Sequence, residues 1–199
     1  MNITKMFFAC VVAVLIMTSA CATGPKPSKF TALQKLDAPA WVVKGSGAFS
    51  DAQGKAFFGV ALTSDSPDMS LMRLAADNRA RNELAMVVQY YTASLMKDYR
   101  AKTRAGEGKG VTAAEELTEA AEKTVTIMTL SGVEIIDHWQ NPETGDLYSL
   151  ARLDLSAVKD AFEKTKELDA RAREYVRKNA ENLHDQLGRE EEKLSGPKD

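Results

Sequence analysis

The chain has 199 residues, of which 44% are hydrophobic and 27% are charged, and its formal charge is −2 from 26 basic and 28 acidic residues. These proportions are ordinary for a folded domain with some additional chain. A near-neutral balance provides no basic field of the kind that attracts nucleic acid. Two histidines and two cysteines also leave few ligands for a metal. We therefore expect no nucleic-acid partner, no metal and no cofactor.

Residues 1–20 have the pattern of a secretory signal peptide. Lys5 gives a positive start, the stretch from Met6 to Met17 is apolar, and residues 18–20 are small. A membrane-spanning helix needs about 20 predominantly apolar residues, so an uncleaved anchor is the less favoured alternative.

The small residues directly before Cys21 resemble a bacterial lipobox. The resemblance implies that Cys21 is the lipidation site, with fatty acyl chains attached, and that Cys10 leaves with the signal. The mature charge is then −3, because Lys5 is the one charged residue lost. Two or more acyl chains anchor a protein stably where one chain does not. Thr18 stands where the lipobox usually has Leu, so simple secretion and an unmodified linker cysteine stay open as alternatives. By the same resemblance, Ala22 after the cysteine favours sorting to the outer membrane.

Residues 21–38 are predicted to form a flexible tether after the lipidated cysteine, since Pro, Gly, Ser and Lys are frequent near its start. Seventeen fully extended residues reach at most about 60 Å. The folded part can therefore stand away from a membrane.

Residues 39–155 are predicted to form one α+β domain. Trp41–Phe49 and Lys55–Thr63 read as two strands of a hairpin around a turn at Asp51–Gly54. Pro67 and Asp68 open a long helix that ends before the glycine-rich stretch Gly106–Gly110.

The second half of this domain is predicted to be a helix followed by another hairpin. The pattern Thr112-Ala-Ala-Glu115 is a capping box, and the helix that it opens continues to about Leu130. Strands are predicted over Val133–Trp139 and Leu147–Leu153, with alternate residues of the latter facing opposite sides. The order β-β-α-α-β-β-α favours a mainly antiparallel four-stranded sheet with helices packed on one face.

Residues 156–199 are predicted to form a long, charged C-terminal helix and tail. Its apolar stripe beyond Leu168 is thin, so the helix is interpreted either as a solvated tail or as an element for contacts with other helices. About 39 helical residues span nearly 60 Å, which is too long to lie wholly against so small a domain.

Four segments together resemble the LPP-twenty family of bacterial envelope lipoproteins. They are Pro39-Ala-Trp-Val42, Phe57-Phe-Gly-Val-Ala61, Ala76-Asp-Asn-Arg-Ala-Arg-Asn-Glu-Leu-Ala85 and Tyr148-Ser-Leu-Ala-Arg-Leu153. The resemblance covers roughly residues 39–155 and implies an α+β unit without enzymatic activity. Some members resemble flagellar outer-membrane lipoproteins that build rings or disks around the motor.

No catalytic motif stands out in the sequence. His138 and His184 lack the spacing of a helical zinc site, and the segment Gly106–Gly110 does not fit a phosphate-binding loop. We expect His138 to be structural or exposed and His184 to be solvated. Arg79 and Glu83, at i and i+4, form a candidate structural ion pair, and Arg81 near the apolar face would need a carboxylate or carbonyl partner.

The sequence therefore predicts a non-enzymatic, lipid-anchored outer-membrane lipoprotein that faces the periplasm and associates with copies of itself, in a flagellum-associated or other envelope assembly. Exposed strand edges and the terminal helix are the expected contact surfaces. The alternative is an envelope binding module that contacts peptidoglycan or regulates a cell-wall synthase. An enzyme that uses carboxylates on the helix faces is the least favoured hypothesis.

Overall fold

The structure is a computed structural model that describes residues 33, 35–106 and 111–195. Side chains are described over the same ranges except at residues 104–106, 111–118 and 194–195. The described residues from Leu33 onward belong to one compact unit. The predicted signal peptide, Cys21, most of the tether and the centre of the glycine-rich stretch lie outside the described residues.

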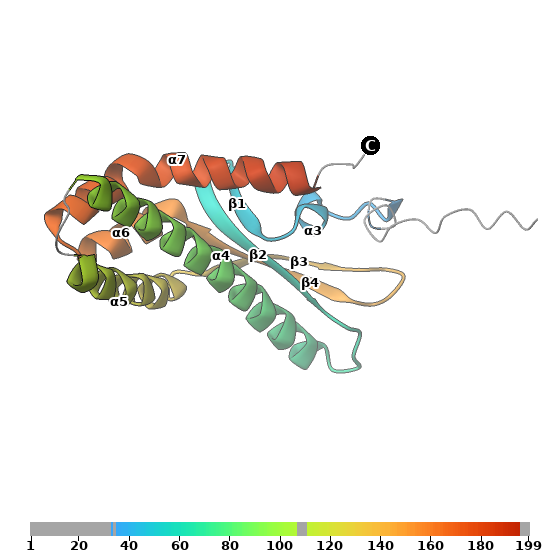
Figure 1. The fold of residues 1–199 in the computed structure, drawn as a ribbon. Coiled ribbons are helices and arrows are strands. Elements are labelled where there is room, and N and C mark those ends of the chain that lie inside the picture. Colours follow the sequence, from blue (N-terminus) through green and yellow to red (C-terminus); the bar gives the residue numbers. More distant parts are fainter. Residues whose placement is uncertain (1–32, 34, 107–110, 196–199) are drawn as a thin grey trace, which may run out of the picture. The chain divides into compact units, whose positions relative to one another are not determined.

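The described part of the chain contains four strands and five helices. They follow in the order α3 (Ala40–Lys44), β1 (Gly47–Asp51), β2 (Gly54–Thr63), α4 (Met69–Gly106), α5 (Val111–Leu130), β3 (Glu134–Gln140), β4 (Leu147–Asp154), α6 (Leu155–Lys164) and α7 (Ala170–Ser195). The strands form one antiparallel sheet in the order β1-β2-β4-β3 (Figure 1). The predicted α+β fold, in which two hairpins meet in one sheet, is confirmed.

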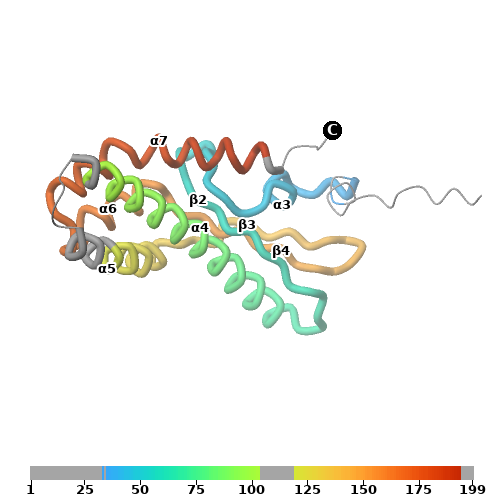
Figure 2. Tube along the Cα trace, viewed as in Figure 1, coloured from blue at the N-terminus to red at the C-terminus, as the bar shows by residue number. Residues whose placement is uncertain are grey.

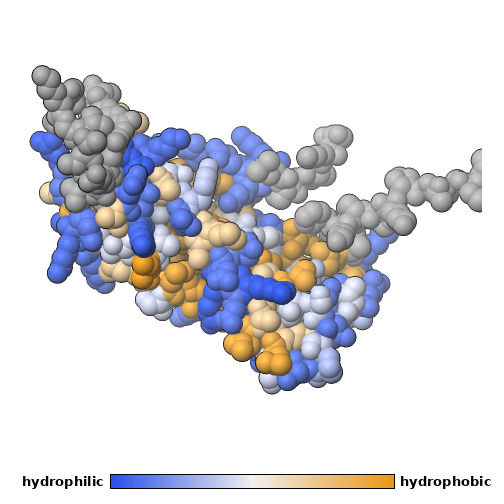
Figure 3. Space-filling view, turned by 60° about the horizontal axis from the view of Figure 1, so that its bottom comes forward, coloured by the Kyte–Doolittle hydropathy of each residue, from blue (hydrophilic) through white to orange (hydrophobic). Residues whose placement is uncertain are grey.

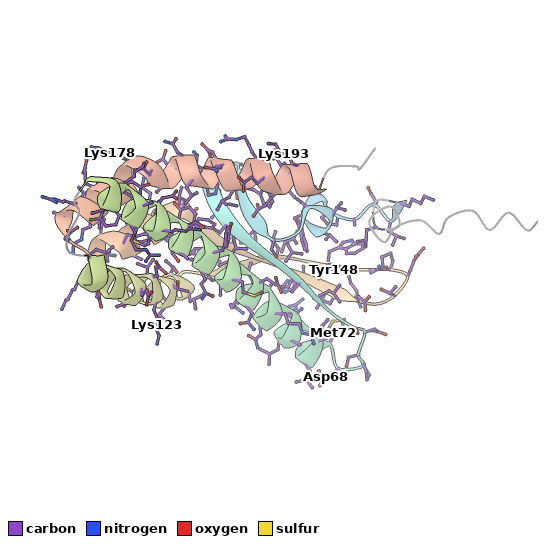
Figure 4. The ribbon with its side chains drawn as sticks, in the orientation of Figure 1. Asp68, Met72, Lys123, Tyr148, Lys178 and Lys193 are labelled. Carbon is purple, nitrogen blue, oxygen red and sulfur yellow. The ribbon has the colours of Figure 1, made fainter. Side chains whose placement is uncertain are left out.

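Short polar side chains set the predicted turns and helix starts. The carboxylate of Asp51 accepts the backbone N–H groups of Gln53 and Gly54 at 2.8 and 3.0 Å, which closes the first hairpin. Asp68 accepts the N–H groups of Ser70 and Leu71, both at 3.0 Å, and so caps the start of α4 (Figure 4). The side chains of the predicted capping box of α5 lie outside those described.

The strand predicted from Trp41 onward is wrong at its start, because Ala40–Lys44 form the short helix α3. Pro39 stands at the N-cap position and Gly45 ends the helix with a φ of 81°, a conformation that glycine adopts readily. Trp41 packs against a small apolar cluster on the face of the sheet opposite to α4, and its Nε1 donates to Asp137 Oδ2 at 2.8 Å. The β preference of the side chains in this segment is therefore outweighed by its packing against the sheet.

The main core lies between the sheet and helices α4 to α7. Alternate residues of β4 face opposite sides, as predicted: Ala151 and Leu153 belong to the main core, while Leu150 belongs to the cluster around Trp41. Helix α4 crosses β2 and β4 (Figures 1 and 2). It lies so close to β2 that a Cβ atom on Gly59 would come within 2.2 Å of Ala80 O and 2.5 Å of Leu84 N.

The predicted long C-terminal helix is present as α7, but its predicted start near residue 156 is wrong, because the chain turns between α6 and α7. Thr165 ends α6, and Asp169 caps the start of α7 by accepting the N–H of Ala172 at 2.7 Å. The turn brings α7 back along the sheet (Figure 2). The interpretation as a solvated tail is also wrong, because the apolar side of α7 is buried in the main core at Ala172, Val176, Ala180, Leu183 and Leu187.

His184 is buried in the seam between α7 and the sheet, with 1% of its surface exposed, so the expectation that it is solvated is wrong. Its Nε2 lies 2.9 Å from Ala56 O, and its ring stands edge-on to Phe57. The buried Tyr91 hydroxyl donates to Ala180 O at 2.8 Å. Burial raises the pKa of Tyr91, so this donor stays protonated. The apolar stripe of α7 is evident in the sequence, whereas the surface that it packs against depends on contacts with residues distant in the chain.

Helix α7 also covers the outer edge of β1. Glu191 accepts the N–H of Ala48 at 2.8 Å, and the Cα of Gly188 lies against Ala48 O, where a Cβ would come within 2.6 Å. The other edge strand, β3, has a bulge between Ile135 and Asp137. The Asp137 carboxylate accepts the N–H of His138 at 2.8 Å. Both edges are thus modified in ways that oppose pairing with another strand.

Replacing Gly59 by alanine should destabilise the fold by about 1–3 kcal/mol, because the new methyl group meets helix backbone that cannot move independently. Urea unfolding measures this loss. The matched control is Gly132→Ala, where the nearest atom to the new methyl is the flexible end of Leu153 at 3.4 Å. Equal stability of the two variants would contradict the close approach of α4 to β2.

Candidate functional site

The three charged residues singled out on α4 do not pair with one another. Arg79 donates from Nη1 to Leu62 O at 2.9 Å. Among the described residues, Glu83 and Arg81 have no hydrogen bond or ion pair, although both are half-buried. The guanidinium of Arg79 is directed to the end of β2, which removes it from the i, i+4 contact that the sequence predicts.

A polar cluster joins α4 to the sheet at Asp77. Its Oδ1 lies 2.6 Å from His138 Nε2 and accepts the Ser149 hydroxyl at 2.6 Å. His138 and Ser149 are directly opposed on β3 and β4, so their side chains leave the same face of the sheet. The sequence indicates none of these contacts except through the alternation that turns Ser149 toward the helices.

The Asp77 cluster has the residue types of a hydrolase triad but not the geometry. Nucleophilic catalysis requires the histidine to take the proton of the serine, whereas both groups here bond to the same carboxylate oxygen. Ser149 is also fully buried, so its hydroxyl is closed to a substrate. The arrangement instead holds α4 in register with β3 and β4, which is the structural role expected for His138.

A second charged cluster lies on the opposite face of the sheet, around the buried Arg152. Its guanidinium donates to both oxygens of Asp51, at 2.7 and 3.2 Å, and pairs with Asp154 at 2.8 Å. The hydrogen bond from Arg152, helped by the backbone N–H groups of the turn, lowers the pKa of Asp51. Arg152 also lies over the ring of Phe58, 6.0 Å from its centroid. The charge of Arg152 is thus matched by two carboxylates, so this cluster stabilises the outer face.

Asp51→Asn should cost about 1–3 kcal/mol of stability near neutral pH, because it keeps the turn acceptor but removes the charge that faces Arg152. A carboxyl group whose pKa is lowered in the folded state stabilises the fold at pH values above the ordinary Asp pKa of about 3.9. This stabilisation is lost as the pH falls through the lowered pKa. Urea unfolding should therefore show the two proteins converging in stability as the pH falls below the ordinary Asp value.

The matched control for this prediction is Asp154→Asn, which contacts the same guanidinium from a side chain that is 50% exposed. Its loss should be smaller, because solvent screens an exposed pair. A difference between Asp51→Asn and the original chain that stays constant down to pH 2 would contradict the role given to this carboxylate.

The described residues contain no group of three or more His, Cys, Asp or Glu side chains that could hold a metal ion. Within the same residues, no helix has both the length and the apolar content needed to cross a membrane.

The most unusual surface belongs to α4. Its solvent side carries four large apolar residues with more than half of their surface exposed, namely Leu71, Leu74, Met86 and Tyr90. Ile127 is similarly exposed on α5, which packs beside the C-terminal half of α4. Figure 3 shows apolar side chains at the surface on this side, with hydrophilic ones between them. Large apolar patches on a folded domain are typical of surfaces that contact other molecules, so this side of α4 is the candidate for such a contact.

Comparison with known proteins adds no relative: no family model matches the chain, and no curated protein matches it. The surface of α4 and the internal pairing of the polar groups are therefore the observations on which a function is inferred.

Proposed function

We propose that this protein is a lipid-anchored lipoprotein of the bacterial envelope that acts by binding other protein molecules, copies of itself first among them, and performs no catalysis. The observation that carries the proposal is the exposed apolar side of α4, with Leu71 and Tyr90 at 62% and 63% exposure. A solvent-facing helix normally carries charged residues there. Apolar side chains in that position are stabilised when a partner covers them.

The absence of a catalytic role rests on how the reactive groups are used. The hydroxyl of Ser149 and the imidazole of His138 both bond to the carboxylate of Asp77 between α4 and the sheet. Arg152 is paired with two carboxylates. Among the described residues, these clusters present no group that combines exposure with the nucleophile–base contact that acid–base or covalent catalysis needs.

The proposed location rests on residues 1–22 of the sequence. A positive start, an apolar middle and small residues before Cys21 support cleavage and acylation at that cysteine. Ala22 supports the outer membrane as the destination, with the folded unit facing the periplasm. The resemblance of the domain to envelope lipoproteins extends the proposal to a ring or disk around a flagellum or to a similar assembly.

Replacing Cys21 by serine should abolish incorporation of labelled palmitate when the full chain is expressed in a Gram-negative host, because serine offers no thiol for acylation. The matched control is Cys10→Ser, which alters the other cysteine inside the predicted signal and should leave the labelling unchanged. Label retained by Cys21→Ser, or lost from Cys10→Ser alone, would contradict anchoring through Cys21.

A further inference from the structure

A hollow of about 400 Å³ lies between the C-terminal end of α4 and the first turns of α7, which run beside each other (Figure 1). Its described lining includes Tyr99 and Lys102 of α4 and Arg171, Tyr175 and Asn179 of α7. Binding sites for small molecules are clefts of about 300–1,000 Å³ that combine apolar walls with a few polar groups. The hollow has this size and this mixed lining.

Two tyrosine rings form the apolar part of the hollow. The rings of Tyr99 and Tyr175 lie with their centroids 5.5 Å apart and their planes at 50°. Both side chains are half-buried and pack against the main core. This packing fixes the rings before a ligand arrives, so binding does not carry the cost of ordering them. A tyrosine offers an apolar face with a polar tip, which matches a sugar ring that has C–H groups on one face and hydroxyls around its edge.

The charged side chains of the hollow are mostly cations. They are Lys102, Arg171 and Lys178, with the single carboxylate of Glu174. Glu174 is already paired with Lys178 Nζ at 3.0 Å. Lys102 Nζ lies 4.8 Å from the centroid of the Tyr175 ring and, among the described residues, has no hydrogen bond or ion pair. The lining thus has an excess of positive charge in a chain whose formal charge is −2, and this excess favours an anionic ligand.

Asn179 adds a fixed polar group to the wall of the hollow. Its Nδ2 donates to Tyr175 O at 2.7 Å. This bond orients the amide and leaves its carbonyl oxygen as an acceptor. Within the described part of the chain, the Tyr175 hydroxyl has no hydrogen bond, so it can both donate and accept. A cation, an acceptor and a hydroxyl therefore lie beside an apolar surface.

We propose that this hollow binds a sugar that carries an acidic group. The tyrosine rings contact the C–H face of the sugar, Lys102 faces the acidic group, and Asn179 and the Tyr175 hydroxyl bond to sugar hydroxyls. A wholly apolar ligand would cover the ammonium group of Lys102 without pairing it, which is costly. A small inorganic anion would leave the tyrosine rings uncovered, and a neutral sugar would leave the charge unused.

The position of the hollow indicates a source for this sugar. The chain from Cys21 enters the helices and strands at α3, where Lys44 pairs at 3.8 Å with Glu192 near the C-terminal end of α7. Tyr175 precedes Glu192 by 17 residues on the same helix, which is about 25 Å along its axis. At this step the inference rests on the proposed function, because anchoring in the outer membrane places the hollow among the carboxylate-bearing sugars of the cell-wall glycan.

Titration of the full chain with single sugars tests the site. The protein is purified in a detergent whose headgroup is not a sugar, and dissociation constants are measured by NMR. The probes are N-acetylmuramic acid, which has a carboxylate, N-acetylglucosamine 1-phosphate, and neutral N-acetylglucosamine. At least one acidic sugar should bind about fivefold or more tightly than the neutral one, because it adds a charge-assisted hydrogen bond to Lys102. The tighter of the two acidic sugars separates a cell-wall glycan from a phosphorylated membrane glycolipid as the source.

Lys102→Gln should lower this preference to about twofold or less while leaving the affinity for the neutral sugar unchanged. The matched control is Lys97→Gln, which changes another exposed lysine of α4 that does not line the hollow. Both lysines are exposed, so neither change should alter thermal melting. Equal binding of the three sugars, no binding of either acidic sugar, or an equal loss of preference in the two variants would overturn the inference.

The two proposals fail separately, because the titration needs no acyl chain. If palmitate is incorporated at Cys21 and neither acidic sugar binds, the sugar site is wrong and the anchoring stands. If an acidic sugar is preferred and Lys102→Gln removes the preference, yet no palmitate is incorporated, the sugar site stands and the anchoring is wrong.

Discussion

Helix α4 can lie against strand β2 only because Gly59 has no side chain, and the positions of the other elements follow from that contact. Ala76 and Ala80 are fully buried on the helix side, and Ala151 is the direct partner of Gly59 on β4. Small residues on both surfaces bring the helix backbone down to the sheet. The short side chain of Asp77 then reaches Ser149 and His138, and the opposite side of the helix turns Leu71 and Tyr90 into solvent.

Helix α7 completes the domain by covering an edge that would otherwise pair with other chains. It is held by the Tyr91 hydroxyl, by the imidazole of His184 and by Glu191, each of which bonds to backbone atoms across the seam. Its outward side carries exposed lysines, including Lys178 and Lys193 near its two ends (Figure 4). The charge that favours a solvated tail in the sequence is therefore the outer half of an amphipathic helix.

Local sequence patterns predicted the fold well where a single side chain determines the backbone conformation. Asp51 and Gly54 set the first turn, Asp68 sets the start of α4, and alternation along β4 separates Ala151 from Leu150. The predictions from sequence were wrong where a contact with a residue distant in the chain determines the local structure. Trp41 is helical because it docks on the sheet, and His184 is buried because α7 folds back.

The candidate sites show the same division between local and distant signals. The contact of Asp77 with Ser149, and that of Asp51 with Arg152, join residues 72 and 101 positions apart, which no local spacing reveals. The apolar residues exposed on α4 could have been noticed in the sequence from their helical spacing. Which side of that helix faces the sheet, however, is fixed by Gly59 and Ala80.

The central claim is that the folded unit works while attached to a membrane through Cys21. Mass spectrometry of the N-terminal peptide, taken from the protein in its native envelope, tests it most directly. The account predicts a peptide that begins at Cys21 and carries the mass of three fatty acyl chains. A peptide that begins at any other residue, or an unmodified Cys21, would contradict it.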